Sequence, residues 1–345
     1  MRRTVLILWG VMIILVPGSL FAADDTAQKP DQLNIAVVCV TVVEAPWTTA
    51  LIQSLERLKK KRPHGLDINW DISENVLPPD AERVLREYAK TGKYGIIWGH
   101  AQYQDAIEGL HKQYPDILWY GAGAGFTPPF GRNFYFGDIL FHEPAYLLGL
   151  IAGMMTESNV IGAVASYPYG DINLTVNGYI AGARAVNPDI KVKMMYLDSW
   201  FDPPRAKEAA LAQIAGGADF IYAERFGPFE ACKEKGKLAF GHITDQYSLA
   251  QEVVVSSSMG LWDPALSFII DEWWNHVTSG VSYHAPKEGK LYRMRDGAAD
   301  IASYHGFESI IPRKVKEKVE QARQAIKEGT MVVPINEKVV TPKGG

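Results

Sequence analysis

The chain has little cysteine and no excess of positive charge. Among its 345 residues only Cys39 and Cys232 are cysteines, and neither has a second Cys or His nearby, which excludes a zinc site by spacing. Cys39 lies in an apolar, strand-like run and Cys232 in a helical stretch, so we expect two small buried side chains. With 35 Lys+Arg against 39 Asp+Glu the formal net charge is −4, which argues against a nucleic-acid-binding protein.

The sequence also lacks the signatures of common enzymes. There is no Gly-x-Ser-x-Gly motif and no phosphate-binding Gly-x-x-x-x-Gly-Lys-Ser/Thr loop. The glycine-rich run 121–125 lacks the correctly spaced third glycine of a dinucleotide-binding motif. The His-Glu pair at 142–143 is followed by Pro144, so the sequence has no metal-binding His-Glu-x-x-His helix there. We therefore expect a protein that is not an enzyme and that has no catalytic residue, metal or cofactor.

A long hydrophobic run is missing except near the N-terminus. Two Arg at positions 2 and 3 precede an apolar run over residues 5–16, and small Ala22 and Ala23 come before two acidic residues. The run is shorter than the approximately 20 residues of a membrane-spanning helix, and the pattern predicts a secretory signal peptide over residues 1–23. No Cys follows for lipid attachment, so we expect a periplasmic protein if the cell has two membranes.

Short β-rich runs alternate with amphipathic helical stretches along the rest of the chain. Such alternation is typical of βαβ units and a parallel sheet, and because it occurs in two series the sequence predicts two α/β lobes. The expected strands are 34–43, 66–72, 94–99, 116–121, 159–166, 190–197, 218–223 and 238–242. The expected helices are 46–61, 79–91, 104–114, 143–157, 172–187, 203–216, 227–236 and 313–328.

Loops after the expected strands are rich in aromatic residues. Ligands of open α/β sheets lie beyond the carboxyl ends of the strands, so these loops border the expected site between the lobes. The aromatic residues are Trp47, Tyr103, Phe126, Tyr167, Tyr169, Trp200, Phe201, Phe226 and Trp262. They fit a planar ligand held between rings, at about 1–3 kcal/mol per stacked base, although aromatic residues at a lobe boundary also simply pack together.

Polar residues in the same loops suit recognition of a ring edge. A carboxylate accepts from an amine or a ring N–H, and an amide both donates and accepts. These residues are Glu74, Asn75, His100, Gln102, Asp171, Asn173, Glu224, Asp245 and Gln246.

Five spaced motifs resemble those of the basic membrane protein family. They are EPAYLLGLIAG at 143–153, NGYIAGARAVNP at 177–188, DSWFDP at 198–203, EACKEKG at 230–236 and GHITDQ at 241–246. Members of this family are extracytoplasmic solute-binding components of ABC importers and include purine nucleoside receptors. The likeness extends from about residue 34 to about residue 333.

The resemblance implies a type I periplasmic binding protein, with two doubly wound α/β lobes joined by three crossovers and a ligand cleft between them. On that fold, lobe I comprises residues 24–140 plus 260–288, and lobe II comprises residues 141–259 plus 289–345. It implies a small-molecule ligand, an inner-membrane ABC permease as partner and a monomer.

Carried over position by position, the resemblance places Trp200 where a ring stacks on the purine, and matches Tyr103 to a Phe of the first-lobe loop. Ile243 and Trp262 stand where nucleoside receptors have an acid and a Lys for the ribose, so a free nucleobase such as adenine is expected over a nucleoside. The expected ligand-binding residues are Trp47, Glu74, Tyr103, Tyr169, Asp171, Trp200, Glu224, Asp245 and Trp262.

Two other functions fit parts of the pattern. A sensor subunit that presents its ligand to a membrane kinase would use the same closed-lobe surface. An exported nucleoside hydrolase would need a metal site or a catalytic nucleophile. Such hydrolases hold calcium with a cluster of Asp residues, which Asp67 and Asp71 alone match poorly.

Overall fold

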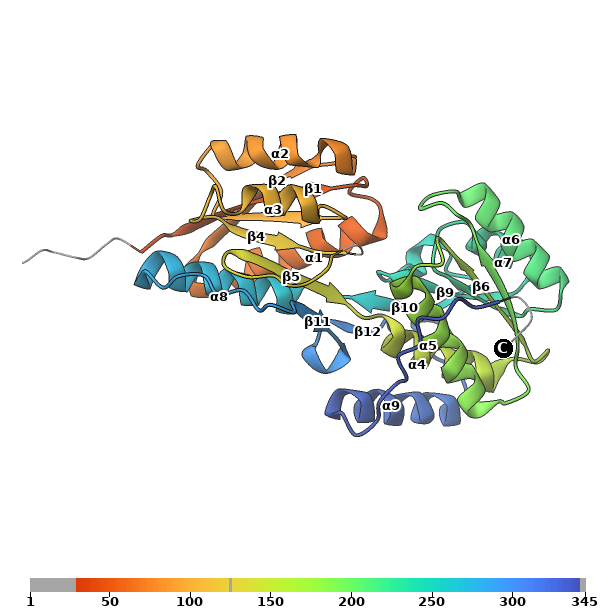
Figure 1. Ribbon diagram of the computed structural model, residues 1–345. Helices are drawn as coiled ribbons and strands as arrows, with labels where there is room; N and C mark the ends of the chain where they lie inside the picture. The colour runs from red at the N-terminus through yellow and green to blue at the C-terminus, as the bar shows by residue number, and fades with distance from the viewer. Residues whose placement is uncertain (1–28, 124–125, 342–345) are drawn as a thin grey trace, which may run out of the picture.

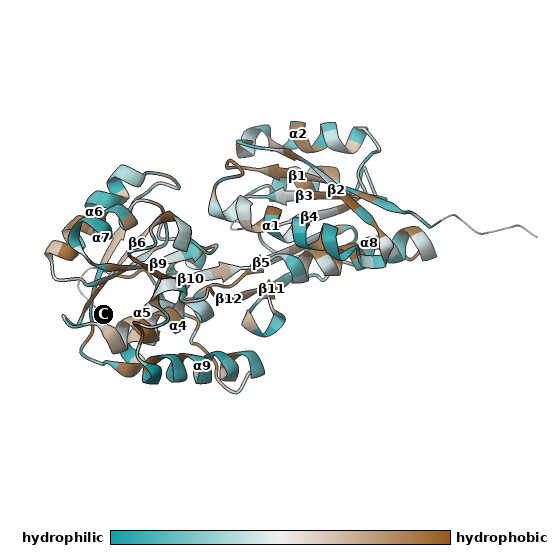
Figure 2. Ribbon diagram, turned by 180° about the vertical axis from the view of Figure 1, so that it is seen from behind, coloured by the Kyte–Doolittle hydropathy of each residue, from teal (hydrophilic) through white to brown (hydrophobic). Residues whose placement is uncertain are grey.

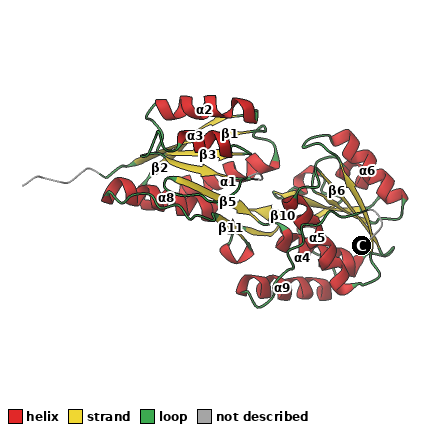
Figure 3. Ribbon diagram, in the orientation of Figure 1, coloured by secondary structure: helices red, strands yellow, loops and turns green. Residues whose placement is uncertain are grey.

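A computed structural model describes residues 29–123 and 126–341, which form two α/β lobes (Figure 1). Helices lie on both faces of each sheet, as Figure 3 shows. The expected signal peptide, residues 1–23, lies outside the described residues.

The first lobe is built on a parallel sheet with the strand order β11-β5-β4-β3-β1-β2. Its strands are β1 (Gln32–Cys39), β2 (Asp67–Ser73), β3 (Ile96–His100), β4 (Leu118–Gly121), β5 (Phe134–Ile139) and β11 (Lys290–Tyr292). Its helices are α1 (Pro46–Lys61), α2 (Pro78–Lys90), α3 (Gln104–Leu110) and α8 (Asp263–Ser279), with the 3-10 turn η1 (Pro63–Gly65) after α1. Helix α1 packs with α8 and α2 packs with α3, so each face of the sheet is covered.

The second lobe has a sheet of order β12-β10-β9-β8-β6-β7, parallel except for β12. Its strands are β6 (Val160–Ala165), β7 (Lys191–Tyr196), β8 (Phe220–Ala223), β9 (Leu238–Ile243), β10 (Val254–Gly260) and β12 (Ala299–Ile301). Its helices are α4 (His142–Met155), α5 (Gly170–Val186), α6 (Pro203–Ala215), α7 (Pro228–Lys235) and α9 (Arg313–Glu328). Short 3-10 turns are η2 (Tyr247–Leu249), η3 (Met294–Asp296) and η4 (His305–Phe307). Figure 2 colours α9 mainly as hydrophilic, in keeping with its Lys and Glu residues.

Within the described residues the chain crosses between the lobes three times. It crosses after β5, after β10 and between β11 and β12. The expected lobe boundary at residue 289 is therefore wrong by a few positions, because β11 pairs with β5 in the first sheet. A strand of three residues carries too little pattern to be assigned from sequence.

Two helices of the second lobe approach each other unusually closely. A Cβ atom at Gly149 of α4 would lie 2.0 Å from the Tyr179 carbonyl oxygen, and one at Gly182 of α5 would lie 2.0 Å from the Tyr146 carbonyl oxygen. Any larger side chain would force the helices apart. These glycines of the 143–153 and 177–188 motifs are thus required by packing.

The two cysteines are buried free thiols, as expected from sequence. Burial raises the pKa of both Cys39 and Cys232 to about 12. The thiols are therefore protonated and unreactive at neutral pH.

Candidate functional site

The strand order of each sheet reverses direction at one point. In the first sheet β1 lies between β2 and β3, and in the second β6 lies between β7 and β8. Connections leave the sheet on opposite faces at such a point, which opens a crevice beyond the carboxyl ends of the two strands. In the first lobe, Trp47 lies just after β1 and His100 is the last residue of β3. In the second lobe, Tyr167 lies just after β6 and Glu224 just after β8.

Four rings gather at the reversal point of the first sheet. Trp47 stacks on His100 with centroids 4.7 Å apart and planes 11° apart, and Trp262 meets Trp47 edge-on at 5.2 Å. Trp98 meets Trp262 edge-on at 5.3 Å. We call these residues the first ring group. Trp47 is half-buried and the other three are fully buried, so Trp47 is the accessible residue of this group.

His100 is a neutral imidazole whose tautomer follows from its partners. Its Nδ1 accepts from the indole N–H of Trp98 at 3.0 Å, so its Nε2 carries the hydrogen and donates to the Trp47 carbonyl oxygen at 3.0 Å. Burial lowers the pKa of His100 to about 4, although the hydrogen bond to Trp47 raises it. The imidazole therefore supports Trp47 as a rigid platform.

The indole N–H of Trp262 is a donor without a protein partner among the described residues, although the ring is fully buried. Buried donors in folded proteins nearly always have an acceptor. The first ring group therefore contains one buried N–H without a partner among the described residues.

Three more rings gather at the second reversal point. Tyr167 and Tyr169 stack at 5.2 Å with planes 12° apart, and Trp200 lies 5.0 Å and 5.9 Å from them. We call these residues the second ring group. The Arg225 guanidinium lies 5.1 Å from the Trp200 ring centre, within cation–π distance. Trp200 is 41% exposed and Tyr169 is 45% exposed, so this group presents ring surface outward.

A buried carboxylate lies beside the second ring group. One oxygen of Glu224 accepts from the Ser166 backbone N–H at 2.8 Å, and the other lies 2.8 Å from Nη1 of Arg225. Burial raises the pKa of Glu224 to about 7, although the charge of Arg225 lowers it. This carboxyl group can change its protonation state near neutral pH.

One acid of the first lobe lies close enough to an acid of the second lobe for their charges to interact. Asp138 near the end of β5 has its pKa raised to about 8, first by burial and then by the charge of Asp171 on α5. Burial also raises the pKa of Asp171, while Arg225 lowers it. Helix α1 of the first lobe additionally contacts β9 of the second. The carboxyl ends of the two sheets therefore lie near each other.

Comparison with known proteins identifies the family. A model described as "ABC transporter substrate-binding protein PnrA-like" (Bmp) matches residues 33–282. The chain belongs to this family. The family is described as ABC transporter substrate-binding proteins, which are solute-binding components and not enzymes, and such components work outside the cytoplasm.

Relatives carry different ligand names. A Haloferax volcanii protein named as an ABC transporter glucose-binding protein is 34% identical over 62% of this chain and 57% of its own length. The chain thus spans little more than half of that relative. A purine-binding protein from Brucella abortus is 26% identical over 77% of this chain and 73% of its own length.

Solved structures agree with the fold. An ABC transporter solute-binding protein from Conexibacter woesei superposes with a TM-score of 0.69 at 17% identity, covering 88% of this chain and 99% of that chain. One from Aeropyrum pernix gives 0.70 at 18% identity, covering 88% and 94%. This PnrA-like chain has the type I periplasmic binding protein fold that its motifs implied.

Three of the residues expected at the site make other contacts in this PnrA-like protein. Tyr103 is buried in the first lobe, where its hydroxyl donates to the Val76 carbonyl. Glu74 accepts from the Val43 backbone N–H at 2.8 Å. Asp245 lies 2.6 Å from His305. The structure does not bring these three side chains into either ring group.

Some residues in or near the two ring groups were not among those selected from sequence. Asp138 lies in a strand, β5, that the pattern did not predict, and Arg225 lies in a loop where only its neighbours Glu224 and Phe226 were noted. His100 and Tyr167 were noted in the loops but not selected. Recognition of the apolar run 134–139 as a strand would have placed Asp138 near a strand end.

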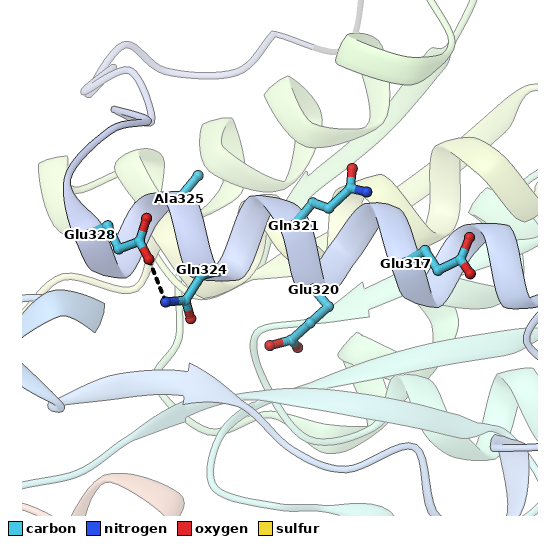
Figure 4. A pocket seen from close by; sticks show the side chains of 6 residues that line it. All are labelled: Glu317, Glu320, Gln321, Gln324, Ala325 and Glu328. Atoms are coloured by element: carbon cyan, nitrogen blue, oxygen red, sulfur yellow. Dashed lines mark hydrogen bonds between the residues drawn. The ribbon is translucent and has the colours of Figure 1, made fainter.

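Two surface hollows lie away from the ring groups. One of about 570 Å³ lies on α9 and is lined by charged and amide side chains, of which Gln324 donates to Glu328 at 2.6 Å (Figure 4). A second, of about 470 Å³, includes His111 and Arg132 of the first lobe. Neither includes a residue of the two ring groups.

Two further features of the described parts of the chain bear on function. No cluster of three or more His, Cys, Asp or Glu side chains there has an arrangement that could hold a metal ion. Over residues 29–123 and 126–341, no helix combines the length and apolar content needed to span a bilayer.

Proposed function

We propose that this protein is the receptor of an ABC importer and that it captures a purine-like solute, a free nucleobase such as adenine, as the two lobes close. The observation that carries the proposal is the pair of ring groups, one at the reversal point of each sheet. Closure would bring Trp47 and Trp200 toward opposite faces of a planar ligand. Each stacked face contributes about 1–3 kcal/mol.

Acids beside the rings suit the edge of a purine. An ionised Asp171 would accept from exocyclic amines and ring N–H groups, while a protonated Asp138 or Glu224 would donate to a ring nitrogen. The raised pKa values of Asp138 and Glu224 mean that both roles are available near neutral pH. The relative named purine-binding supports this class of ligand.

The preference for a base over a nucleoside rests on two positions. Ile243 is buried, and Trp262 has no carboxylate or ammonium group to hold ribose hydroxyls. Burying a hydroxyl without a hydrogen bond is costly. In this proposal the protein works as a monomer in the periplasm, after removal of residues 1–23, and hands its ligand to an inner-membrane permease.

The first experiment is mass spectrometry of the small molecule released when the purified protein is denatured, followed by calorimetry with adenine, adenosine and glucose. Release of a purine base, with adenine bound more tightly than adenosine, is the expected result. Tighter binding of adenosine would overturn the argument from Ile243 and Trp262. Binding of glucose alone would overturn the purine class and favour the ligand named for the Haloferax relative.

A further inference from the structure

The end of the described chain is bound across α5 of the second lobe (Figure 1). The Asn177 amide donates to the carbonyls of Asn336 at 2.9 Å and Lys338 at 2.8 Å. The Val340 N–H donates to the Tyr196 hydroxyl at 3.3 Å. We call residues 336–340 the C-terminal strap.

One buried amide joins this strap to the second ring group. Asn173 is 2% exposed, and its Nδ2 donates to the carbonyls of Pro168 and Glu337, both at 3.0 Å. Its Oδ1 accepts from the Tyr196 hydroxyl at 2.6 Å. All three partners lie outside α5, so Asn173 is a junction between separate segments.

The partners of Asn173 adjoin the rings. Pro168 lies between Tyr167 and Tyr169, and Tyr196 ends β7 just before the loop that carries Trp200. An amide supplies two N–H donors and one acceptor oxygen, which is the set that two carbonyls and a hydroxyl require.

The strap also brings a charge to this place. A Cβ atom at Gly170 would lie 3.3 Å from Oε2 of Glu337, so the Glu337 side chain lies over the start of α5. Its charge contributes to the raised pKa of Asp171. The strap therefore lies against the start of α5, and its charge acts on Asp171.

We propose that Asn173 is a positioning residue and that the C-terminal strap acts through it to hold the second ring group in its binding geometry. The inference rests on the proposed function, because it takes the second ring group to contact the ligand. Asn177 also binds the strap backbone but makes no hydrogen bond to the described residues 166–169, so it serves as the comparison that separates stability from positioning.

The test compares Asn173→Ala with Asn177→Ala in the full chain. Hydrogen exchange of the ligand-free protein is expected to rise in residues 166–169 for Asn173→Ala and to stay unchanged there for Asn177→Ala. Adenine affinity is expected to fall about fivefold for Asn173→Ala, the factor for one net hydrogen bond, and by less than about twofold for Asn177→Ala. Asn173→Asp, which keeps the shape and the acceptor but loses both donors, replaces the alanine variant if that one does not fold.

Equal exchange in the two variants, or no change over residues 166–169 in either, would overturn the positioning role. If exchange changes as expected but adenine binds neither variant nor the unmodified protein, the purine assignment fails and the role of Asn173 stands.

Discussion

Trp200 differs from the other tryptophans of the two ring groups in its exposure. It is 41% exposed, whereas Trp262 and Trp98 are fully buried. Two tyrosines and the Arg225 guanidinium hold it in place. A ring that is both fixed and accessible stacks on a ligand without first losing conformational freedom.

We expect Trp200→Ala to weaken adenine binding at least about tenfold, or about 1.4 kcal/mol, because one stacking face is lost. Calorimetry measures the affinity. Phe201→Ala is the matched control, since Phe201 is the next residue and is 70% exposed. Equal losses in both variants would mean that the loop, and not the Trp200 ring, matters for binding.

Ile243 adopts an unusual backbone conformation at the end of β9. Its φ is 73°, in the left-handed region that a β-branched residue rarely occupies, and it is 5% exposed. Asp tolerates this region better than Ile does. An acid here would meet less backbone strain than the present residue.

We expect Ile243→Asp to strengthen adenosine binding about tenfold relative to adenine, because a carboxylate would accept from ribose hydroxyls. Calorimetry with both compounds measures the ratio. Ile243→Val, also β-branched and apolar, should leave the ratio unchanged. A folded Asp variant with the ratio of the original protein would show that residue 243 does not face the ribose.

Sequence reasoning located aromatic loops but not the direction of each side chain. Trp47 and Tyr103 each begin or precede a helix after a strand, so their patterns look equivalent. Tyr103 is drawn into the core by a hydrogen bond to Val76, which lies 27 positions earlier in the chain. Such a contact depends on tertiary packing and leaves no local signal.

The end of strand β5 gives the protein a specific pH response. Asp138 there has a pKa of about 8 in the folded protein, well above the approximately 3.9 of an unfolded chain. The folded state therefore keeps a proton that the unfolded state loses. Its contribution to stability is complete below about pH 4 and is lost as the pH rises through 8.

We expect Asp138→Asn to remove this loss. The free energy of unfolding of the variant, minus that of the original protein, should rise by about 2 kcal/mol between pH 4 and pH 8 and then level off. This rise is smaller than the value that the full difference in pKa would give, because Asp138 is only half-buried. Urea denaturation at several pH values measures it.

Two other groups do not disturb this difference. Burial lowers the pKa values of His100 and His142 to about 4, so these residues make the folded protein less stable as the pH falls below about 6.5. They do so equally in the variant and in the original protein. Asp116→Asn, at a side chain that is 93% exposed, is the control. A flat difference for Asp138→Asn would contradict a buried proton at Asp138.

Secondary structure followed the sequence pattern in several long helices, but not in all of them. Helices 46–61 and 313–328 have the expected bounds. They are recognisable because each has a proline at or before its first turn and Lys or Glu residues on its outer face. Strand β5 and helix α8 were missed, and strand 34–43 ends early at Cys39. Strands β11 and β12 are too short for alternation to be detected.

At the scale of the molecule, the two lobes are joined by the three crossovers and by direct contacts such as that of α1 with β9. This architecture allows one lobe to rotate against the other while each sheet stays intact. The sequence predicted the two-lobed fold because its strand–helix alternation repeats; the exact crossover at β11 could not be predicted.

We expect the radius of gyration to decrease when adenine binds, toward the approximately 20 Å of a compact chain of this length. Small-angle X-ray scattering with and without adenine measures the change, and Trp200→Ala at the same adenine concentration should show a smaller one. An unchanged radius at saturating adenine would contradict lobe closure.

The order of strands also determines when the molecule can be completed during folding. Both sheets receive their last strand from residues 290–301, after more than four fifths of the chain has been made. Until β11 and β12 arrive, β5 and β10 are open sheet edges, which are templates for pairing with other chains. Aggregation is therefore a hazard of chains cut before residue 290, and folding of either lobe depends on contacts that are distant in sequence, which makes it slow.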